Sequence, residues 1–246
     1  MARLPRDIKP LQDIHTIFRS VDNSFIFQKS ETINLIFKTF ERMIFKHKSK
    51  IYAWVGMSNH QHIFNQAPEG ENQQEKYTQV GDMFRDCFSI FARKLNRQSK
   101  RVGGVIRDRT KTVKVYDHHQ ALTLLIYIFL NPVRAGIVRH PKDFLNHNFA
   151  MYAYGPAHCM YKKQARIFTF HPAYLALGLG WKTRRRKFMW LVEKALKTWG
   201  LQKLIGISAS HGLGRNQHRI HYEDFVRFAT AWIPNKFEIG PAPPQR

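Results

Sequence analysis

His60 and His62 are two histidines separated by a single residue, directly after the apolar run 51–55. Side chains alternate between the two faces of an extended strand, so both imidazoles should point to the same side. At 3.3–3.4 Å per residue they would lie roughly 7 Å apart along the strand, close enough to converge on one metal ion. A chain with 13 histidines can also carry such a pair as surface or hydrogen-bonded side chains, so the spacing alone does not identify a metal site.

Tyr127 is the second candidate for chemistry, 65 residues after His62. It begins the string Tyr-Ile-Phe-Leu-Asn-Pro-Val-Arg-Ala-Gly-Ile-Val. A phenol hydroxyl can serve as a covalent nucleophile. The alternative is an aromatic side chain at a core position, because residues 119–130 carry apolar side chains at helical spacing.

The elements that must position these residues follow from the hydrophobic pattern. Runs rich in β-branched and aromatic residues predict strands, and apolar residues spaced three and four apart predict amphipathic helices. The expected strands are 14–21, 50–55 and 59–64, and the expected helices are 30–48, 77–96 and 119–130. Residues 102–106 and 112–116 are expected to form either a strand pair or an extended loop. This order predicts an α+β fold, in which helices pack on one face of an antiparallel sheet and the other face stays open for a ligand.

The rest of the chain is expected to be a separate, mainly helical accessory region. Residues 151–170 show no regular pattern, and helices are expected at 171–179, 183–199 and about 222–232. The sequence therefore predicts a first domain over residues 1–155 and a C-terminal region over 156–246.

The charge of the chain points to a polyanionic partner. Its 246 residues contain 40 Lys and Arg against 17 Asp and Glu, a net charge of +23. Such an excess attracts nucleic acid through its phosphates, although part of it can be a solvated basic surface. We expect no membrane partner, because no run of about 18 apolar residues occurs. Only two cysteines are present, without metal-type spacing, which indicates a reducing, cytoplasmic compartment.

The three motifs together resemble a known family. Met-Ser-Asn-His60-Gln-His62, the Arg-Val-Gly-Gly element at 101–104 and the string from Tyr127 to Val138 are similar to the single-tyrosine HUH transposases. Within that family they are most similar to the REP-associated tyrosine transposases. The resemblance covers roughly residues 1–155 and implies the ferredoxin-like HUH fold.

The resemblance implies a nucleophile and a metal. Tyr127 matches the tyrosine that attacks single-stranded DNA, forming a 5′-phosphotyrosine intermediate and freeing a 3′-OH. His60 and His62 match the metal ligands, and a divalent ion, Mg²⁺ or Mn²⁺, could offset charge that develops on a phenol of pKa about 10. Insertion-sequence relatives place a third ligand, a glutamine, four residues after the tyrosine. Asn131 holds that position here, although the proline after it disfavours a helical conformation.

The resemblance and the charge together predict the DNA partner, a single-stranded hairpin bound by a monomer or a homodimer. Basic residues of the N-terminal arm, of the 101–114 segment and of the end of the tyrosine helix are candidates to contact it. They are Arg3, Arg6, Arg101, Arg107, Arg109, Lys111, Lys114 and Arg134. His15, His118 and His119 are expected to be ordinary polar residues rather than ligands.

Gln61 departs from the family pattern, which usually has a bulky apolar residue between the histidines. That side chain faces the helices, and an unsatisfied buried amide would cost about 1–3 kcal/mol. Two functions therefore stay open: a DNA strand transferase, and a catalytically inactive protein that binds hairpin DNA. A replication initiator or relaxase also uses an H-x-H site, but the single tyrosine followed by Asn-Pro-Val-Arg-Ala-Gly argues against it.

Overall fold

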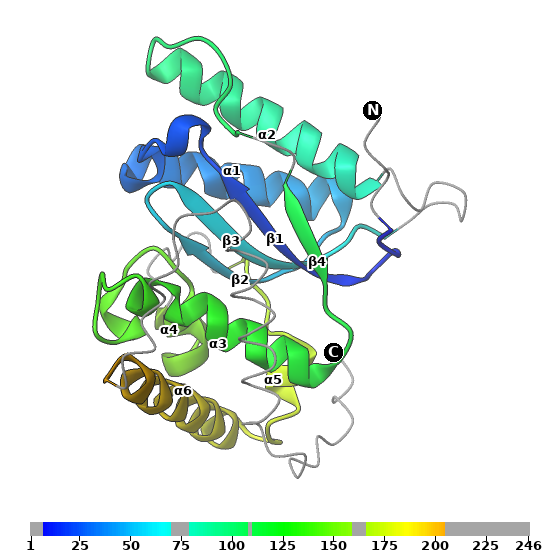
Figure 1. The fold of residues 1–246 in the computed structure, drawn as a ribbon. Helices are drawn as coiled ribbons and strands as arrows, with labels where there is room; N and C mark the ends of the chain where they lie inside the picture. The colour runs from blue at the N-terminus through cyan, green and yellow to red at the C-terminus, as the bar shows by residue number, and fades with distance from the viewer. Residues whose placement is uncertain (1–6, 70–78, 108–109, 159–165, 205–246) are drawn as a thin grey trace.

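A four-stranded antiparallel sheet is the centre of the molecule. In the computed structural model, which describes residues 7–69, 79–107, 110–158 and 166–204, the strands are ordered β2-β3-β1-β4 (Figure 1). Their bounds are β1 (Asp13–Arg19), β2 (Ile51–Gly56), β3 (His60–Gln66) and β4 (Lys111–Lys114). The strand with the two histidines, β3, is thus central and is paired on both edges.

Two helices cover one face of this sheet. They are α1 (Ser30–His47) and α2 (Gln79–Gln98). The ring of Phe37 lies 4.8 Å from Trp54 of β2, and Phe88 lies 4.4 Å from Phe18 of β1. These aromatic contacts join both helices to the same side of the central strands.

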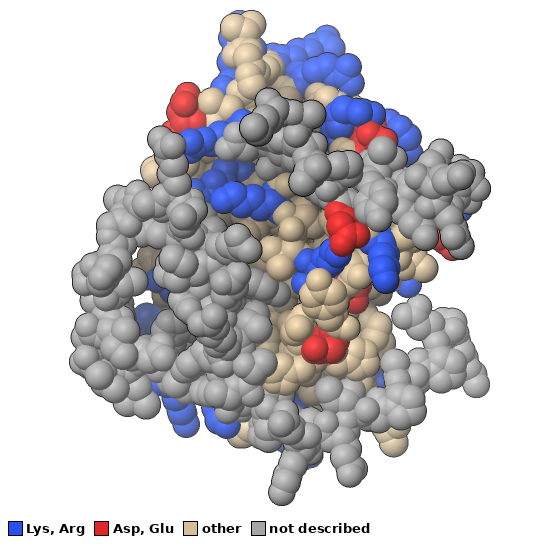
Figure 2. Space-filling view, turned by 45° about the vertical axis from the view of Figure 1, so that its right-hand side comes forward, with Lys and Arg blue, Asp and Glu red and all other residues tan. Residues whose placement is uncertain are grey.

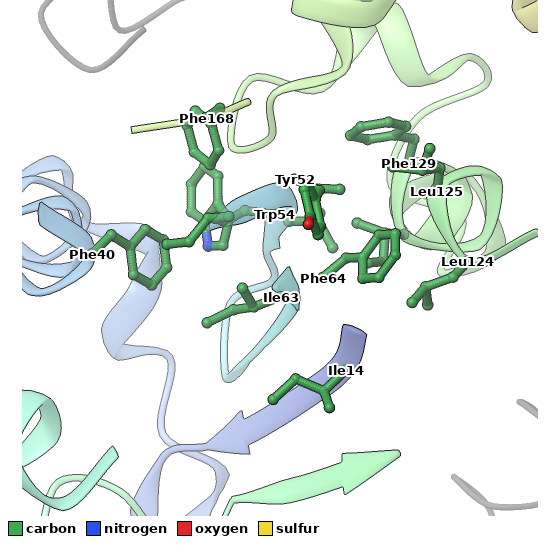
Figure 3. Close-up of a cluster of buried hydrophobic side chains, with 14 of the residues drawn as sticks. Ile14, Phe40, Tyr52, Trp54, Ile63, Phe64, Leu124, Leu125, Phe129 and Phe168 are labelled. Atoms are coloured by element: carbon green, nitrogen blue, oxygen red, sulfur yellow. The ribbon is translucent and has the colours of Figure 1, made fainter. Parts of the chain in front are cut away.

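The helix α3 (His118–Arg134) lies on the opposite side of the sheet from α1 and α2 (Figure 1). It begins at Asp117, whose carboxylate accepts a hydrogen bond of 2.7 Å from the backbone N–H of Gln120. Figure 3 shows Leu124, Leu125 and Phe129 of α3 beside Phe64 of β3, with Trp54 and Phe40 on the other side. All of these side chains are buried, so one continuous core runs through the sheet.

The C-terminal helices pack against α3. They are α4 (Phe149–Tyr154), the short α5 (Pro172–Leu175) and α6 (Trp181–Leu204). Phe188 of α6 is fully buried, and its ring lies 5.5 Å from Tyr152 of α4, 5.5 Å from Tyr174 of α5 and 6.3 Å from Phe129 of α3. Four 3₁₀ turns complete the described structure, at Val21–Asn23, Ile26–Gln28, Pro141–Asp143 and Pro156–His158.

The α+β class with an antiparallel sheet is confirmed. One feature of the arrangement differs from expectation: α3 covers part of the face that was expected to be open. Of the two possibilities for the 102–116 segment, residues 102–106 form a loop and only 111–114 form a strand. Only Ile106 pairs, in a single bridge to Ser20, because Gly103 has a φ of +95° and Val102 points into solvent. The boundary at 155/156 stays a prediction, and the helix expected at 222–232 lies outside the described residues.

The tyrosine helix also runs further than expected. We expected it to end at residue 130, before Pro132, but it continues through Asn131 to Arg134. A proline inside a helix removes the hydrogen bond of its own N–H to the preceding turn, and its ring crowds the carbonyl four residues earlier. Leu130 and Pro132 are buried, and their packing outweighs the disfavoured conformation before proline. Asn131 is therefore held on the same helix as Tyr127.

No helix in the described part of the chain is both long and apolar enough to span a membrane.

An ionic cluster ties α1 to α2 on the far side of the sheet from α3. Asp86 of α2 receives hydrogen bonds from Arg42 at 3.1 and 3.2 Å and from Lys46 at 2.9 Å, and it lies 3.0 Å from His47. The ligand atoms of His47, Asp86 and Cys87 lie within 4.8 Å of one another, as metal ligands could. However, burial raises the pKa of the Cys87 thiol to about 12, and two cations already neutralise the carboxylate. The cluster therefore has the character of an ion-pair network.

We predict that Phe188→Ala destabilises the whole described fold. Removing a buried aromatic ring costs about 3–5 kcal/mol, which corresponds to roughly 10 °C in the melting temperature of a protein this size. Thermal unfolding measured by circular dichroism checks this. Phe45→Ala, at a side chain that is 80% exposed, is the control and should melt like the wild type. If α6 unfolded in a separate transition at a lower temperature than the rest, the result would contradict a single core shared by α6 and the sheet.

We predict that Asp86→Asn lowers the free energy of unfolding by about 1 kcal/mol at pH 7. The hydrogen bonds from Arg42, Lys46 and His47 hold the pKa of Asp86 well below its usual range. A lowered carboxyl pKa adds stability above the unfolded pKa of about 3.9, and this stability is lost as the pH falls. Urea unfolding should therefore show the two proteins converging as the pH falls below about 4, toward the lowered pKa of Asp86. Asp82→Asn, at an exposed carboxylate paired only with Arg85, is the control.

Candidate active site

His60 and His62 lie on the face of β3 that α3 covers. Their ring centroids are 5.1 Å apart, and the rings are nearly perpendicular, at 75°. His62 is buried, whereas His60 is partly exposed at the start of the strand. The structure therefore brings the two imidazoles together on one side of the sheet, as the spacing predicts.

The hydrogen bond of His60 suits metal ligation. Its Nδ1 lies 2.7 Å from Oδ1 of Asn59. An amide oxygen only accepts, so Nδ1 must carry the proton, and the lone pair of the neutral ring is on Nε2. A ligating histidine usually donates its second N–H to such an acceptor, which fixes its tautomer and its orientation.

His15 of β1, which the sequence analysis expected to be an ordinary polar residue, lies at this site. Its Nε2 lies 3.0 Å from Nδ1 of His62, and the two rings are nearly parallel, with centroids 5.2 Å apart. His15 is fully buried, and burial lowers its pKa to about 3, so its ring is neutral at pH 7. The pairing of β1 with β3 creates this contact, and no local motif around His15 indicates it.

Tyr127 lies against this pair of histidines. Its ring centroid is 5.6 Å from that of His62 and 5.8 Å from that of His15, with edge-to-face geometry in both cases. The side chain is buried, with 3% exposure. The three residues come from one chain, so the tyrosine reaches the histidines without a second copy of the protein.

Two arginines lie around the tyrosine. The guanidinium carbon of Arg134 is 4.9 Å from the centroid of the Tyr127 ring, seven residues along the same helix. Burial lowers the pKa of Arg134, and its charge interaction and hydrogen bond with Tyr127 oppose that shift. Arg19, opposite His60 in the sheet, was missed by the sequence analysis. Its pKa is lowered by burial and by the charge of Arg107, and an interaction with Tyr127 opposes this too.

Asn131 follows Tyr127 by one helical turn and is partly buried. Its Nδ2 is buried and has no hydrogen-bond partner among the described residues. The unpartnered Nδ2 cannot bind a metal, so Asn131 could serve as a ligand only through its Oδ1. His60 and His62, each hydrogen-bonded at Nδ1, are the donors that a divalent metal could accept here. The residues present therefore fit the metal that the resemblance implies.

Apart from Arg134, which lies against Tyr127, the predicted DNA contacts divide into three groups. Lys111 is exposed on β4 and is paired with Ile17, which is itself paired with His62, so Lys111 lies on the same sheet face as His62. Arg107 is also exposed, and its backbone N–H donates a hydrogen bond to the carbonyl of Arg19. By contrast, Lys114 is on the other face, where it pairs with Asp7 at 2.6 Å, and Arg101 donates to the carbonyl of Gly104 in its own loop. Arg3, Arg6 and Arg109 lie outside the described residues. Basic side chains are prominent on the described surface in Figure 2.

Gln61 points to the opposite face, toward α1 and α2, as expected, and is fully buried. Its Oε1 accepts a hydrogen bond from the indole N–H of Trp54. Gly56 leaves the room for this pair, because a Cβ there would lie 2.7 Å from the Trp54 ring. The Nε2 of Gln61 has no partner in the described part of the chain. Gln61 is thus accommodated in the core, with half of its amide satisfied.

Comparisons with known proteins bear on the fold. Neither a scan against protein-family models nor a search of curated proteins finds a match. Among solved structures, the chain matches a REP-associated tyrosine transposase bound to a REP hairpin, with a TM-score of 0.51 and 16% sequence identity. The match covers 62% of this chain and 85% of that chain. The chain therefore shares the fold of that transposase, as the resemblance of its motifs implies.

Proposed function

We propose that this protein is a metal-dependent transposase that nicks and rejoins single-stranded hairpin DNA through a 5′-phosphotyrosine on Tyr127. The observation that carries the proposal is the position of the Tyr127 ring, 5.6 Å from His62 on one sheet face. A tyrosine can act as the nucleophile of a phosphoryl transfer, and an H-x-H pair with a metal and nearby arginines can stabilise the charge that develops. The shared fold with a transposase bound to a REP hairpin supports the same assignment.

In the proposed reaction the hydroxyl of Tyr127 attacks the phosphorus of a phosphodiester. A bond forms between phosphorus and the phenolic oxygen, the bond to the 3′ oxygen breaks, and the phenolic proton is lost as the 3′ oxygen gains one. The 5′ end stays on the protein, so the bond energy is kept for rejoining. Arg134 and Arg19 would offset the negative charge that develops on the phosphoryl oxygens.

His60 and His62 would hold the metal, with Asn131 as the third protein ligand. Mg²⁺ or Mn²⁺ suits a site completed by phosphate oxygens, and Mn²⁺ accepts imidazole more readily. When bound, such an ion supplies Lewis-acid polarisation of the scissile phosphate. The two imidazoles, each hydrogen-bonded at Nδ1, would present their other nitrogens to it.

The alternative is a catalytically inactive protein that keeps the fold and binds hairpin DNA. The incompletely satisfied amide of Gln61, directly between the two histidines, is the observation that favours it. The two functions share the DNA partner and differ in whether a covalent intermediate forms. A labelled hairpin therefore separates them.

We predict that the wild type with Mn²⁺ and a hairpin oligonucleotide forms an SDS-resistant adduct that keeps a 3′-end label, while a 5′-end label is released on a fragment with a 3′-OH. Tyr127→Phe should form no adduct, because it loses only the nucleophilic oxygen. Tyr116→Phe, at an exposed tyrosine, is the control and should react like the wild type. An adduct with Tyr127→Phe would refute the nucleophile, and hairpin binding by the wild type without any adduct would favour the alternative.

We predict that Lys111→Ala weakens hairpin binding and reduces the slope of log K against log salt by roughly one. The reason is its exposed position on the sheet face of His62. Fluorescence anisotropy at several salt concentrations measures both quantities. Lys38→Ala is the control. It removes an equal charge from an exposed position on α1, the helix that covers the sheet face opposite to that of His62, and it should leave the slope unchanged. Equal losses in both variants would show non-specific charge attraction.

A further inference from the structure

We infer that His15 is a positioning residue of the proposed metal site, whose Nε2 accepts the Nδ1 proton of His62 and so keeps the lone pair of His62 on Nε2 for the metal. This inference rests on the proposed function, because it assigns His62 as a ligand. It adds a third histidine that acts through His62.

The contact is built into the sheet. Within the β1–β3 ladder, His15 is opposite Phe64 and His62 is opposite Ile17, so the two histidines are diagonal neighbours on one face. Their nitrogens are 3.0 Å apart, within hydrogen-bond distance, and both rings are almost completely buried. Backbone pairing on both sides of β3 thus holds this hydrogen bond in place.

The chemistry of two neutral imidazoles allows two arrangements. If His15 donates, the proton of His62 is on Nε2, and that nitrogen has no lone pair for a metal. If His62 donates, its Nε2 has the lone pair, and His15 carries its own proton on Nδ1. Metal binding through Nε2 selects the second arrangement. His15 would then do for His62 what the amide oxygen of Asn59 does for His60.

A neutral acceptor also suits a site for DNA. A carboxylate in the position of His15 would accept the same hydrogen bond, but it would place a negative charge beside a surface that is proposed to bind phosphate. The buried imidazole orients His62 without adding that charge. Its ring also packs edge-to-face with the ring of Tyr127, so the same side chain borders both the ligand and the proposed nucleophile.

Metal affinity in the full-length protein tests the inference. We expect His15→Leu to weaken Mn²⁺ binding about 10- to 100-fold, measured by electron paramagnetic resonance titration without DNA. His15→Gln, whose amide oxygen can accept the proton, should recover most of the loss. Thr16→Val is the matched control. Thr16 is on the same strand as His15 but points to the opposite face of the sheet, where its hydroxyl donates a buried hydrogen bond to Asn65. Its loss should leave the Mn²⁺ affinity at the wild-type value. Wild-type affinity in His15→Leu, or an equal loss in Thr16→Val, would overturn the inference.

The tautomer of His62 provides a test that needs no metal. Long-range ¹H–¹⁵N spectra of protein labelled at histidine should show the His62 proton on Nδ1 in the wild type and in His15→Gln, and a shift toward Nε2–H in His15→Leu. A wild-type proton on Nε2 would overturn the inference. A wild type that shows the expected tautomer and yet binds no Mn²⁺ would instead contradict the metal in the proposed function.

Discussion

The antiparallel pairing of β1 with β3 is the constraint on which the candidate site depends. Its register places Arg19 opposite His60 and Ile17 opposite His62, so an arginine, a third histidine and the H-x-H pair share one face. A slip of one residue would turn every one of these side chains to the other face, among the aromatic rings under α1 and α2. Since Phe18, Trp54 and Ile63 are buried there, the hydrophobic core itself specifies the register that assembles the polar site.

The position of Tyr127 depends on a second constraint, the packing of α3 against the sheet and against α6. Leu124, Leu125 and Phe129 fix the helix against β2 and β3 (Figure 3). On its other side α6 packs over it through Phe188, whose ring lies 6.3 Å from that of Phe129. The continuation of the helix through Pro132 matters equally, because it keeps Asn131 and Arg134 on the turns that follow Tyr127. Apolar packing on both sides of α3 therefore helps to set the position of the nucleophile relative to the histidines.

The sequence was sufficient to predict features that are periodic or contiguous. The amphipathic helices, the alternating strands and the shared side of His60 and His62 all follow from local spacing, and Tyr127 was found within one continuous string. His15 and Arg19 could not be found in this way, because their proximity to the site depends on which strands pair and in what register. The partner of Gln61 depends on the same long-range geometry, and the end of α3 depends on burial that overrides a local preference before proline.

The electrostatics of the site are consistent with an anionic ligand. Burial lowers the pKa of both Arg19 and Arg134, and the positive charge of Arg107 lowers the pKa of Arg19 further. Keeping these two side chains charged therefore costs the fold some free energy. A buried charge is stabilised by a counter-charge, and a phosphodiester placed beside Tyr127 would provide one for both arginines. The neutral ring of His15 fits the same arrangement, because it orients His62 without competing as an anion. Binding of DNA phosphate would therefore relieve a repulsion that the free protein must carry.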